Sequence, residues 1–190
     1  MRTGTTTEVE LKFLDPDLDQ VRQRLQDAGA RLEQPRELET NIVFDDANHS
    51  LRDSKRLLRL RNGHELTVKI PLEDPTYKAR REINLDVAEG EVEAFLEGLG
   101  FTADWRYEKW REGWDLDGMF VTLDELPFIG AVVEIEGDRE KIDSTASKLG
   151  LAKNRTSTAN YSGLYREYAD AHSIEGGDMT FAAEAELSSR

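Results

Sequence analysis

Apolar and polar residues alternate with a period of two over much of the chain. The stretch TEVELKF, residues 7–13, shows the pattern first, because each apolar side chain is followed or preceded by a charged or polar one. Alternation of this kind predicts eight strands, over residues 6–13, 31–44, 56–61, 66–71, 77–85, 106–116, 119–126 and 131–136. Short turn signals such as Asn62-Gly63-His64 and Asp117-Gly118 join neighbouring strands. Such turns are typical of hairpins, so we expect an antiparallel sheet.

Three further segments have apolar residues at helical spacing, in residues 15–30, 86–100 and 138–150. Asp15 is the expected cap of the first helix, with Pro16 at its first helical position. The expected apolar stripe of the second helix is Val92, Phe95, Leu96 and Leu99. Each segment has a glycine near its end, where helices commonly stop. Many antiparallel strands with a few helices make an α+β domain.

Length, composition and charge narrow the class of protein. At 190 residues the chain suits one domain, which we expect over residues 1–168, with a mobile or loosely docked tail over residues 169–190. The net charge of −14 argues against binding to nucleic acid or to an anionic membrane. No cysteine is present, which excludes disulfides and thiolate chemistry. The first residues have no apolar signal region, so we expect a cytoplasmic protein.

The polar faces of the predicted strands are sorted by charge. Because successive side chains of a strand point to opposite faces, each face can be read separately. The carboxylates on these faces are Glu8, Glu10, Asp124, Glu134 and Glu136. The cations are Lys12, Arg59, Arg61, Lys69, Arg80, Lys109 and Arg111. A half-buried sheet with a wet outer face would explain any one strand, but it gives no reason to sort charge by sign.

A closed barrel with the charged faces inside explains the sorting better. Adjacent carboxylates on one strand face lie about 6.6 Å apart. At an effective dielectric near 20 their repulsion is roughly 2.5 kcal/mol, which bound cations would relieve. Oxygen ligands select hard cations such as Mg²⁺ or Mn²⁺, and arginine binds phosphate oxygens in bidentate fashion. Carboxylates, metal and a basic ring together suit phosphoryl transfer from a linear triphosphate.

TEVELKF also matches the E-x-E-x-K signature of the CYTH superfamily, the triphosphate tunnel metalloenzymes, which the chain resembles. The resemblance continues in order through ETNIVFD, LLRLR, LTVKIP, ARREINL, YEKWREGW, VTLDELPFIGAVVEIEG and NYSGLY, over roughly residues 6–165. Adenylyl cyclases of class IV, thiamine triphosphatases and inorganic triphosphatases belong to this superfamily. The signature alone is weak, whereas the ordered set is strong. One departure is Asn160-Tyr161, where the family often has Ser-Tyr.

The resemblance implies an eight-stranded antiparallel barrel with a hydrophilic tunnel, flanked by about three to five helices. It implies catalytic roles for Glu8, Glu10 and Lys12. It implies that Mg²⁺ or Mn²⁺ is held by Glu8, Glu10, Asp124, Glu134 and Glu136. The implied phosphate-binding residues are Lys12, Arg59, Arg61, Lys69, Arg80, Lys109, Arg111 and Lys153. Glu82 also fits a family position, with pairing to Arg80 as the simpler interpretation.

The expected function is metal-dependent hydrolysis of a triphosphate, with tripolyphosphate or thiamine triphosphate as substrate. Two alternatives remain open: adenylyl cyclase chemistry, which converts ATP to cyclic AMP and pyrophosphate, and non-catalytic binding of polyphosphate or nucleotide. We expect a small-molecule triphosphate as partner, no nucleic acid, no membrane, and a monomer or homodimer. The histidines His49, His64 and His172 show no ligand spacing and are expected on the surface.

Overall fold

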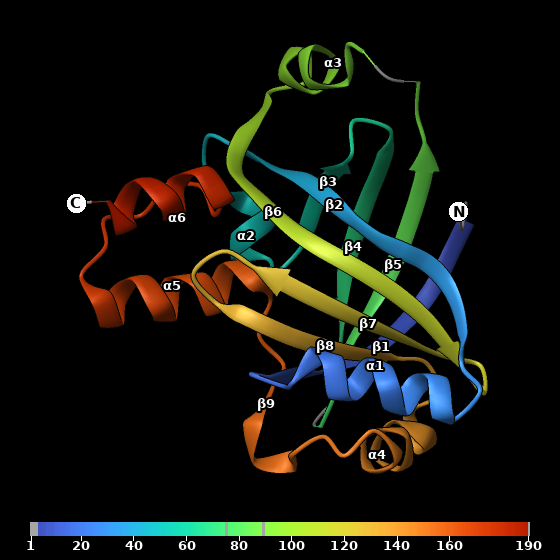
Figure 1. The fold of residues 1–190 in the computed structure, drawn as a ribbon. Helices are drawn as coiled ribbons and strands as arrows, with labels where there is room; N and C mark the ends of the chain where they lie inside the picture. Colours follow the sequence, from blue (N-terminus) through green and yellow to red (C-terminus); the bar gives the residue numbers. More distant parts are fainter. Residues whose placement is uncertain (1–3, 75, 89, 190) are drawn as a thin grey trace.

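The computed structural model describes residues 4–74, 76–88 and 90–189, and its main feature is a closed barrel (Figure 1). Its strands are β1 (Gly4–Leu14), β2 (Arg31–Asp46), β3 (Leu57–Arg61), β4 (Glu65–Leu72), β5 (Lys78–Asp86), β6 (Phe101–Leu116), β7 (Met119–Leu126) and β8 (Gly130–Glu136). The strand order is β5-β4-β3-β2-β6-β7-β8-β1, and pairing of β1 with β5 closes the ring. Every pairing is antiparallel, so the predicted barrel is confirmed.

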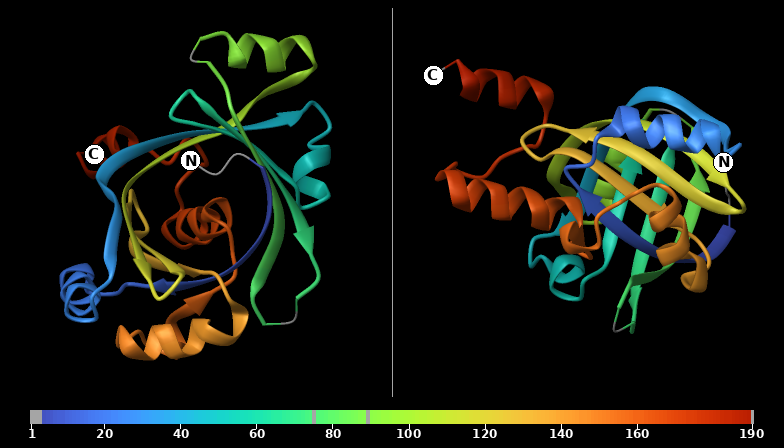
Figure 2. Two further views of the ribbon diagram at one scale, coloured as in Figure 1. Left: turned by 90° about the vertical axis from the view of Figure 1, so that its right-hand side faces the viewer. Right: turned by 60° about the horizontal axis from the view of Figure 1, so that its bottom comes forward.

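Six α-helices surround the barrel within the described residues, where three to five were expected. They are α1 (Leu18–Asp27), α2 (Ser50–Asp53), α3 (Val92–Gly98), α4 (Arg139–Lys148), α5 (Tyr161–His172) and α6 (Phe181–Ser188). A 3-10 turn, Lys153–Arg155, leads into a short ninth strand, β9 (Thr156–Ser157), which pairs with β1. Viewed along the barrel, α5 is seen through the ring of strands, at its far end (Figure 2, left). None of the described helices is long and apolar enough to cross a bilayer.

The main hydrophobic core lies outside the barrel, beneath α1 and α4. Because strand side chains alternate, β7 and β8 turn their apolar residues outward and their polar residues inward. Val121 and Ile135 pack against Leu25 of α1 and Ile142 of α4, and all four are 0% exposed. Burial of this apolar surface therefore stabilises the barrel from outside. The interior is left to polar side chains.

Two hairpin turns have the backbone that the sequence predicts. Asn62 and Gly63 adopt φ values of 48° and 72°, and Asp117 and Gly118 adopt 55° and 81°. Positive φ at both central residues is the type I′ geometry, which follows the twist of the strands. These turns fix the register of β3 with β4 and of β6 with β7.

Two details of the predicted helices were wrong. Asp17, not Asp15, caps α1, where its side chain accepts a hydrogen bond from the Gln20 backbone N–H. In α3 only Leu96 of the expected stripe is buried, while Phe95 and Leu99 are 67% and 61% exposed. Helix α3 projects from one end of the barrel (Figure 1), and there Leu96 packs in a cluster with Phe44, Leu58 and Leu60.

Part of the C-terminal segment, around Met179, contacts β6. Met179 is fully buried, and its backbone N–H donates to Arg106 O at 3.0 Å. The Glu108 backbone N–H in turn donates to Met179 O at 3.0 Å. The Trp105 indole N–H donates to Gly177 O at 3.1 Å. Helix α5 also crosses the expected boundary at residue 168, so the barrel and this segment share one packed cluster.

Candidate functional site: a charged tunnel

The barrel encloses a cavity of about 1220 Å³, and nearly every predicted site residue lines it. Those that do are Glu8, Glu10, Lys12, Arg59, Arg61, Lys69, Arg80, Lys109, Arg111, Glu134 and Glu136. Asp124 lies directly behind this lining, 0% exposed and in contact with Arg111. The charged strand faces therefore look inward.

The acidic side of the cavity is formed by β7, β8 and β1. Glu10 stands opposite Glu136 in the strand register, and Lys12 stands opposite Glu134. The Lys12 ammonium lies 2.5 Å from Glu10 and 2.9 Å from Glu134. Although burial would raise the pKa of Glu134, Lys12 and Arg111 hold it well below its ordinary value. Glu134 is therefore ionised at neutral pH.

Arg111 connects the acidic side to the basic side. Its guanidinium donates to both carboxylate oxygens of Asp124, at 2.7 and 2.5 Å, and to Glu134 at 2.5 Å. Lys109 approaches the same Asp124 at 3.3 Å. A bidentate pair of this kind fixes the orientation of both groups. Asp124 is thus held in one position at the centre of the tunnel wall.

Glu8 is the carboxylate that protein cations neutralise least completely. The Lys69 ammonium donates to both of its oxygens, at 2.7 and 2.8 Å, but Lys69 is shared with Glu82 at 2.8 Å. Burial raises the pKa of Glu8 to about 7, a shift that Lys69 opposes and Glu10 reinforces. An additional cation beside Glu8 would relieve this cost. Glu82 pairs with Lys69, so the simpler interpretation of a pair with Arg80 is not supported.

The donor set fits a hard divalent cation. Five carboxylates on three adjacent strands offer only oxygen ligands, the kind that Mg²⁺ and Mn²⁺ prefer. Burial is the largest cause of the raised pKa of Glu8, and the neighbouring carboxylates Glu10, Glu82 and Glu136 raise it further. The residues that would hold the ion are Glu8, Glu10, Asp124, Glu134 and Glu136.

Tyr161 of α5 enters the same network, and sequence reasoning assigned it no role. Its hydroxyl donates to Asp124 at 2.5 Å, and Lys12 and Lys109 lie over its ring at 5.3 and 4.9 Å from the centroid. Burial and the neighbouring Asp124 raise the pKa of Tyr161 well above its usual value, so the hydroxyl stays protonated. Asn160 caps α5 by accepting from the Gly163 backbone N–H. Asn160 therefore caps the helix at the position where the family often has serine.

Sequence reasoning also missed Lys78 and Glu39, which both line the cavity. Lys78 is in close contact with Glu10. Both residues lie in predicted strands, and sorting every residue of those strands by face would have found them. Glu39 stands on β2 among the basic residues and is 1% exposed.

Lys153 does not join the other predicted phosphate-binding residues. Its side chain is 62% exposed and pairs with Asp143 of α4 at 2.7 Å. Lys153 lies in the 3-10 turn between α4 and β9. It is not among the described residues that line the cavity. A phosphate-binding role for Lys153 therefore stays a prediction from the resemblance, and in this structure the side chain lies away from the other predicted phosphate-binding residues.

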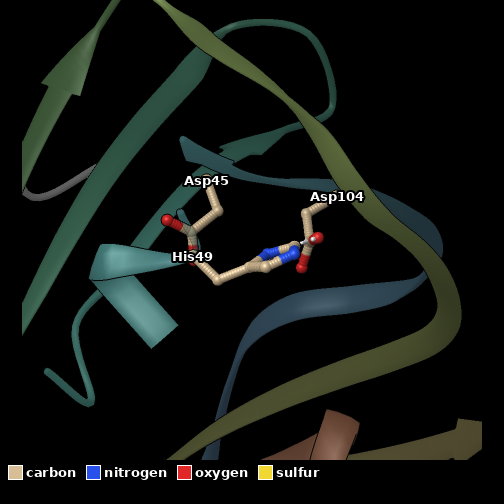
Figure 3. A group of neighbouring side chains, drawn as sticks. All are labelled: Asp45, His49 and Asp104. Atoms are coloured by element: carbon tan, nitrogen blue, oxygen red, sulfur yellow. Dashed lines mark ion pairs between the residues drawn. The ribbon is translucent and has the colours of Figure 1, made fainter. Parts of the chain in front are cut away.

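One histidine is not isolated from other ligand-type residues. Asp45, His49 and Asp104 converge so that one ligand atom from each lies within 4.8 Å of the others (Figure 3). The His49 Nδ1 atom is 3.3 Å from Asp104. The Asp45 carboxylate already accepts the backbone N–H groups of Leu51 and Arg52, at 3.0 and 2.9 Å. Asp45 thus stabilises the first turn of α2, whatever else this group can hold.

The structure is a closed antiparallel barrel whose cavity is lined by both carboxylates and cations. A model of the CYTH domain matches residues 6–157. The chain belongs to the CYTH domain family. The segment that docks on β6 lies beyond the matched residues. A search of curated proteins found no match.

Three solved structures illustrate the likeness. The PH1819 protein of Pyrococcus horikoshii is 27% identical, with a TM-score of 0.66 over 84% of this chain and 98% of that one. A conserved hypothetical protein of Pyrococcus furiosus is 25% identical, with a TM-score of 0.69 over 83% and 99%. HpAC1 of Hippeastrum, described as a suggested adenylyl cyclase with a dominant triphosphatase activity, is 16% identical, with a TM-score of 0.60 over 85% and 95%. At 16% identity the last likeness concerns the fold alone.

Proposed function

We propose that the protein hydrolyses a linear triphosphate, tripolyphosphate or thiamine triphosphate, with the help of Mg²⁺ or Mn²⁺. The observation that carries the proposal is the meeting of inward carboxylates and inward cations in one cavity. A polyanion needs the basic groups, a divalent cation needs the carboxylates, and phosphoryl transfer needs both close together. HpAC1, a protein of the same fold, is described by its triphosphatase activity, which is consistent with this choice.

In the proposed mechanism the basic side chains hold the triphosphate in line and neutralise its charge. Arg59, Lys69 and Lys109 provide donors from three different strands, so the phosphate chain is gripped from several directions. A divalent cation held by the carboxylates supplies Lewis-acid neutralisation of the phosphate oxygens and acidifies water. Water attacks the terminal phosphorus, the bridging P–O bond breaks, diphosphate leaves, and the proton passes to solvent. Lys12, Glu8 and Glu10 keep the acidic side aligned during this step.

Adenylyl cyclase chemistry is the second candidate, and the aromatic side chains in the cavity wall support it. Trp105 and Tyr165 line one part of the cavity, beside the phosphate-binding ring. The Arg59 guanidinium donates to the Tyr107 hydroxyl at 3.4 Å, which joins the basic and aromatic parts of the wall. An organic group attached to the triphosphate would find apolar contacts there. In that case the 3′-hydroxyl of ATP would attack the α-phosphorus and pyrophosphate would leave.

The test is incubation of the purified protein with Mg²⁺ or Mn²⁺ and, separately, tripolyphosphate, thiamine triphosphate and ATP, with all products identified. Release of orthophosphate from one of the first two supports the proposal. Cyclic AMP with pyrophosphate overturns it in favour of the second candidate. A thermal shift without turnover would indicate a binding protein, since ligand at 100 times its dissociation constant adds about 2.7 kcal/mol of stability.

A further inference from the structure

Glu39 is a buried carboxylate on the basic side of the tunnel, apart from the five that would hold a metal. It stands on β2 opposite Lys109 of β6, and its neighbour Asn41 stands opposite Arg61 of β3. Its side chain is 2% exposed and lines the cavity. Buried carboxylates are rarely kept without a partner or a purpose.

The contacts of Glu39 are with the cations that face the cavity. One carboxylate oxygen lies 3.4 Å from the Lys109 ammonium, and the other lies 3.4 Å from Nε of Arg61. The Asn41 side-chain amide donates to the first oxygen at 3.0 Å. Burial alone would raise the pKa of Glu39, but Lys109, Arg61 and Arg111 hold it well below its ordinary value. The group is therefore negatively charged at neutral pH.

Unsatisfied polar atoms gather around this carboxylate. Among the described residues, no hydrogen-bond partner exists for Oε2 of Glu39, Oδ1 of Asn41, or Nε of Arg59 and Arg61. Glu39, Arg59 and Arg61 all line the cavity, and Oε2 of Glu39 and Nε of Arg61 are ion-paired with each other at 3.4 Å. Their remaining hydrogen-bonding capacity is therefore directed at the cavity.

The positive charge around Glu39 argues against a role as a metal ligand. Lys109, Arg61, Arg111 and Arg59 all act on it, so a divalent cation at this position would meet strong repulsion. We infer that Glu39 is a positioning residue, which holds the Lys109 ammonium and the Arg61 guanidinium in the orientation that grips the triphosphate. The inference rests on the proposed function, because it concerns the same substrate and the same cavity.

A positioning role and a direct-binding role for Glu39 predict different effects of removing its charge. Glu39 attracts the same two cations that the triphosphate needs, so it opposes binding of the polyanion while it keeps its ligands aligned. Removing its charge should leave binding as tight or make it tighter, and should slow turnover because the cations lose their alignment. Loss of a partner that orients a directly bound group commonly costs about 10- to 100-fold. A group that contacts phosphate or metal directly would show the opposite pattern in binding.

The test compares Glu39→Gln and Glu39→Asp with Glu112→Gln as matched control. Glu112 is also buried, at 6% exposure, but it faces outward, where Arg22 and Trp114 satisfy it. The measurements are kcat and KM for the triphosphate that the wild-type protein hydrolyses, metal-free binding of tripolyphosphate by calorimetry, Mn²⁺ binding without triphosphate, and the melting temperature.

We expect Glu39→Gln to lower kcat about tenfold or more, with KM not raised and metal-free tripolyphosphate bound at least as tightly as before. Glu39→Asp keeps the charge and should fall between wild type and Glu39→Gln in kcat. Glu112→Gln should lower the melting temperature and leave kcat unchanged. The inference is overturned by an unchanged kcat in both Glu39 variants, by a raised KM with normal kcat, or by weaker Mn²⁺ binding without triphosphate.

Failure of the proposed function would be recognised separately. If the wild-type protein hydrolyses none of the three triphosphates, that function is wrong, and the metal-free binding comparison decides the place of Glu39 by itself. Tighter tripolyphosphate binding by Glu39→Gln would then support its attraction to the phosphate-gripping cations. Weaker binding would overturn it.

Discussion

The inner and outer faces of the barrel are both largely buried, yet they are built from opposite chemistry. On β8, Val133 and Ile135 turn outward into a dry core at 0% exposure, while Glu134 and Glu136 turn inward to the cavity. The two faces share one backbone and one register. Residues are therefore buried in two different environments, an apolar core outside the barrel and a charged cavity inside it. Outside, apolar contacts stabilise the fold, whereas inside, buried charges line a cavity, which the proposed function assigns to a triphosphate.

The two buried carboxylates Glu112 and Glu39 show the difference at the level of one group. Glu112 faces outward and is fully engaged, with Arg22 at 3.0 Å and the Trp114 indole at 2.8 Å. Glu39 faces inward, with cations at 3.4 Å and one oxygen lacking a hydrogen bond within the described part of the chain. An interior that is charged but incompletely satisfied is costly for folding, and proteins retain such cost at functional sites.

The largest expected effect lies on the outer face, in Ile135→Ala. Deleting a fully buried branched side chain leaves a cavity in the core between β8 and the helices, at a cost of about 2–5 kcal/mol. Chemical denaturation would measure the loss. In the fraction that remains folded, KM should be unchanged, because the neighbouring Glu134 and Glu136 keep their place. A change in KM larger than the loss of folded protein would show that the two faces are not independent.

On the inner face, Glu8→Gln should have the opposite effect, a loss of activity without a loss of stability. We expect activity to fall by at least about 100-fold, since even partners of metal ligands are worth 10- to 100-fold. Stability should be equal or higher at pH 8. Because the pKa of Glu8 is raised to about 7, ionising it costs the folded protein more than the unfolded chain, and this penalty grows as pH rises from about 4.5 to 7. The substitution removes the penalty.

The measurements for this variant are the rate with the preferred triphosphate and the denaturation midpoint at pH 8 and at pH 5. The advantage of Glu8→Gln over wild type should shrink at pH 5, where the folded wild-type protein holds the proton on Glu8. Full activity in Glu8→Gln would show that Glu8 is not needed to hold the metal. A lower midpoint at both pH values would mean that the interior carboxylates stabilise the fold after all.

How far the sequence could predict this molecule follows from the same division. A period of two located all eight barrel strands, and the sorting of charge by strand indicated that the polar faces meet inside. Lys78 shares a strand face with Arg80 and Glu82 but was left out of that set, and Glu39 was missed because the faces of its strand were not sorted. The assignment of Lys153 depended on a loose local match, without alternation to fix its direction, and it stays a prediction.

The helices beyond residue 160 were harder to predict for a different reason. The anchoring of Met179 depends on backbone hydrogen bonds to Arg106 and Glu108, more than 70 positions earlier in the chain. No local pattern of apolar and polar residues predicts a contact of that kind. The cluster of Asp45, His49 and Asp104 is similar, since its members come together only when β2, α2 and β6 are in place (Figure 3).

The smallest expected effect is that of Lys153→Ala. This variant tests whether a lysine must point into the tunnel to contribute to binding, or whether its charge alone is enough. Lys153 carries the same charge as Lys69, but its side chain is 62% exposed and paired with Asp143, whereas Lys69 is 11% exposed and paired with Glu8. Exposed ion pairs are worth about 0–1 kcal/mol, so stability should hardly change. Triphosphate affinity should also stay within about twofold, because solvent and salt screen a charge in this position. Lys69→Met, measured beside it by calorimetry with tripolyphosphate, should bind clearly more weakly. Equal losses in the two variants would show that the 3-10 turn moves to the tunnel when ligand binds.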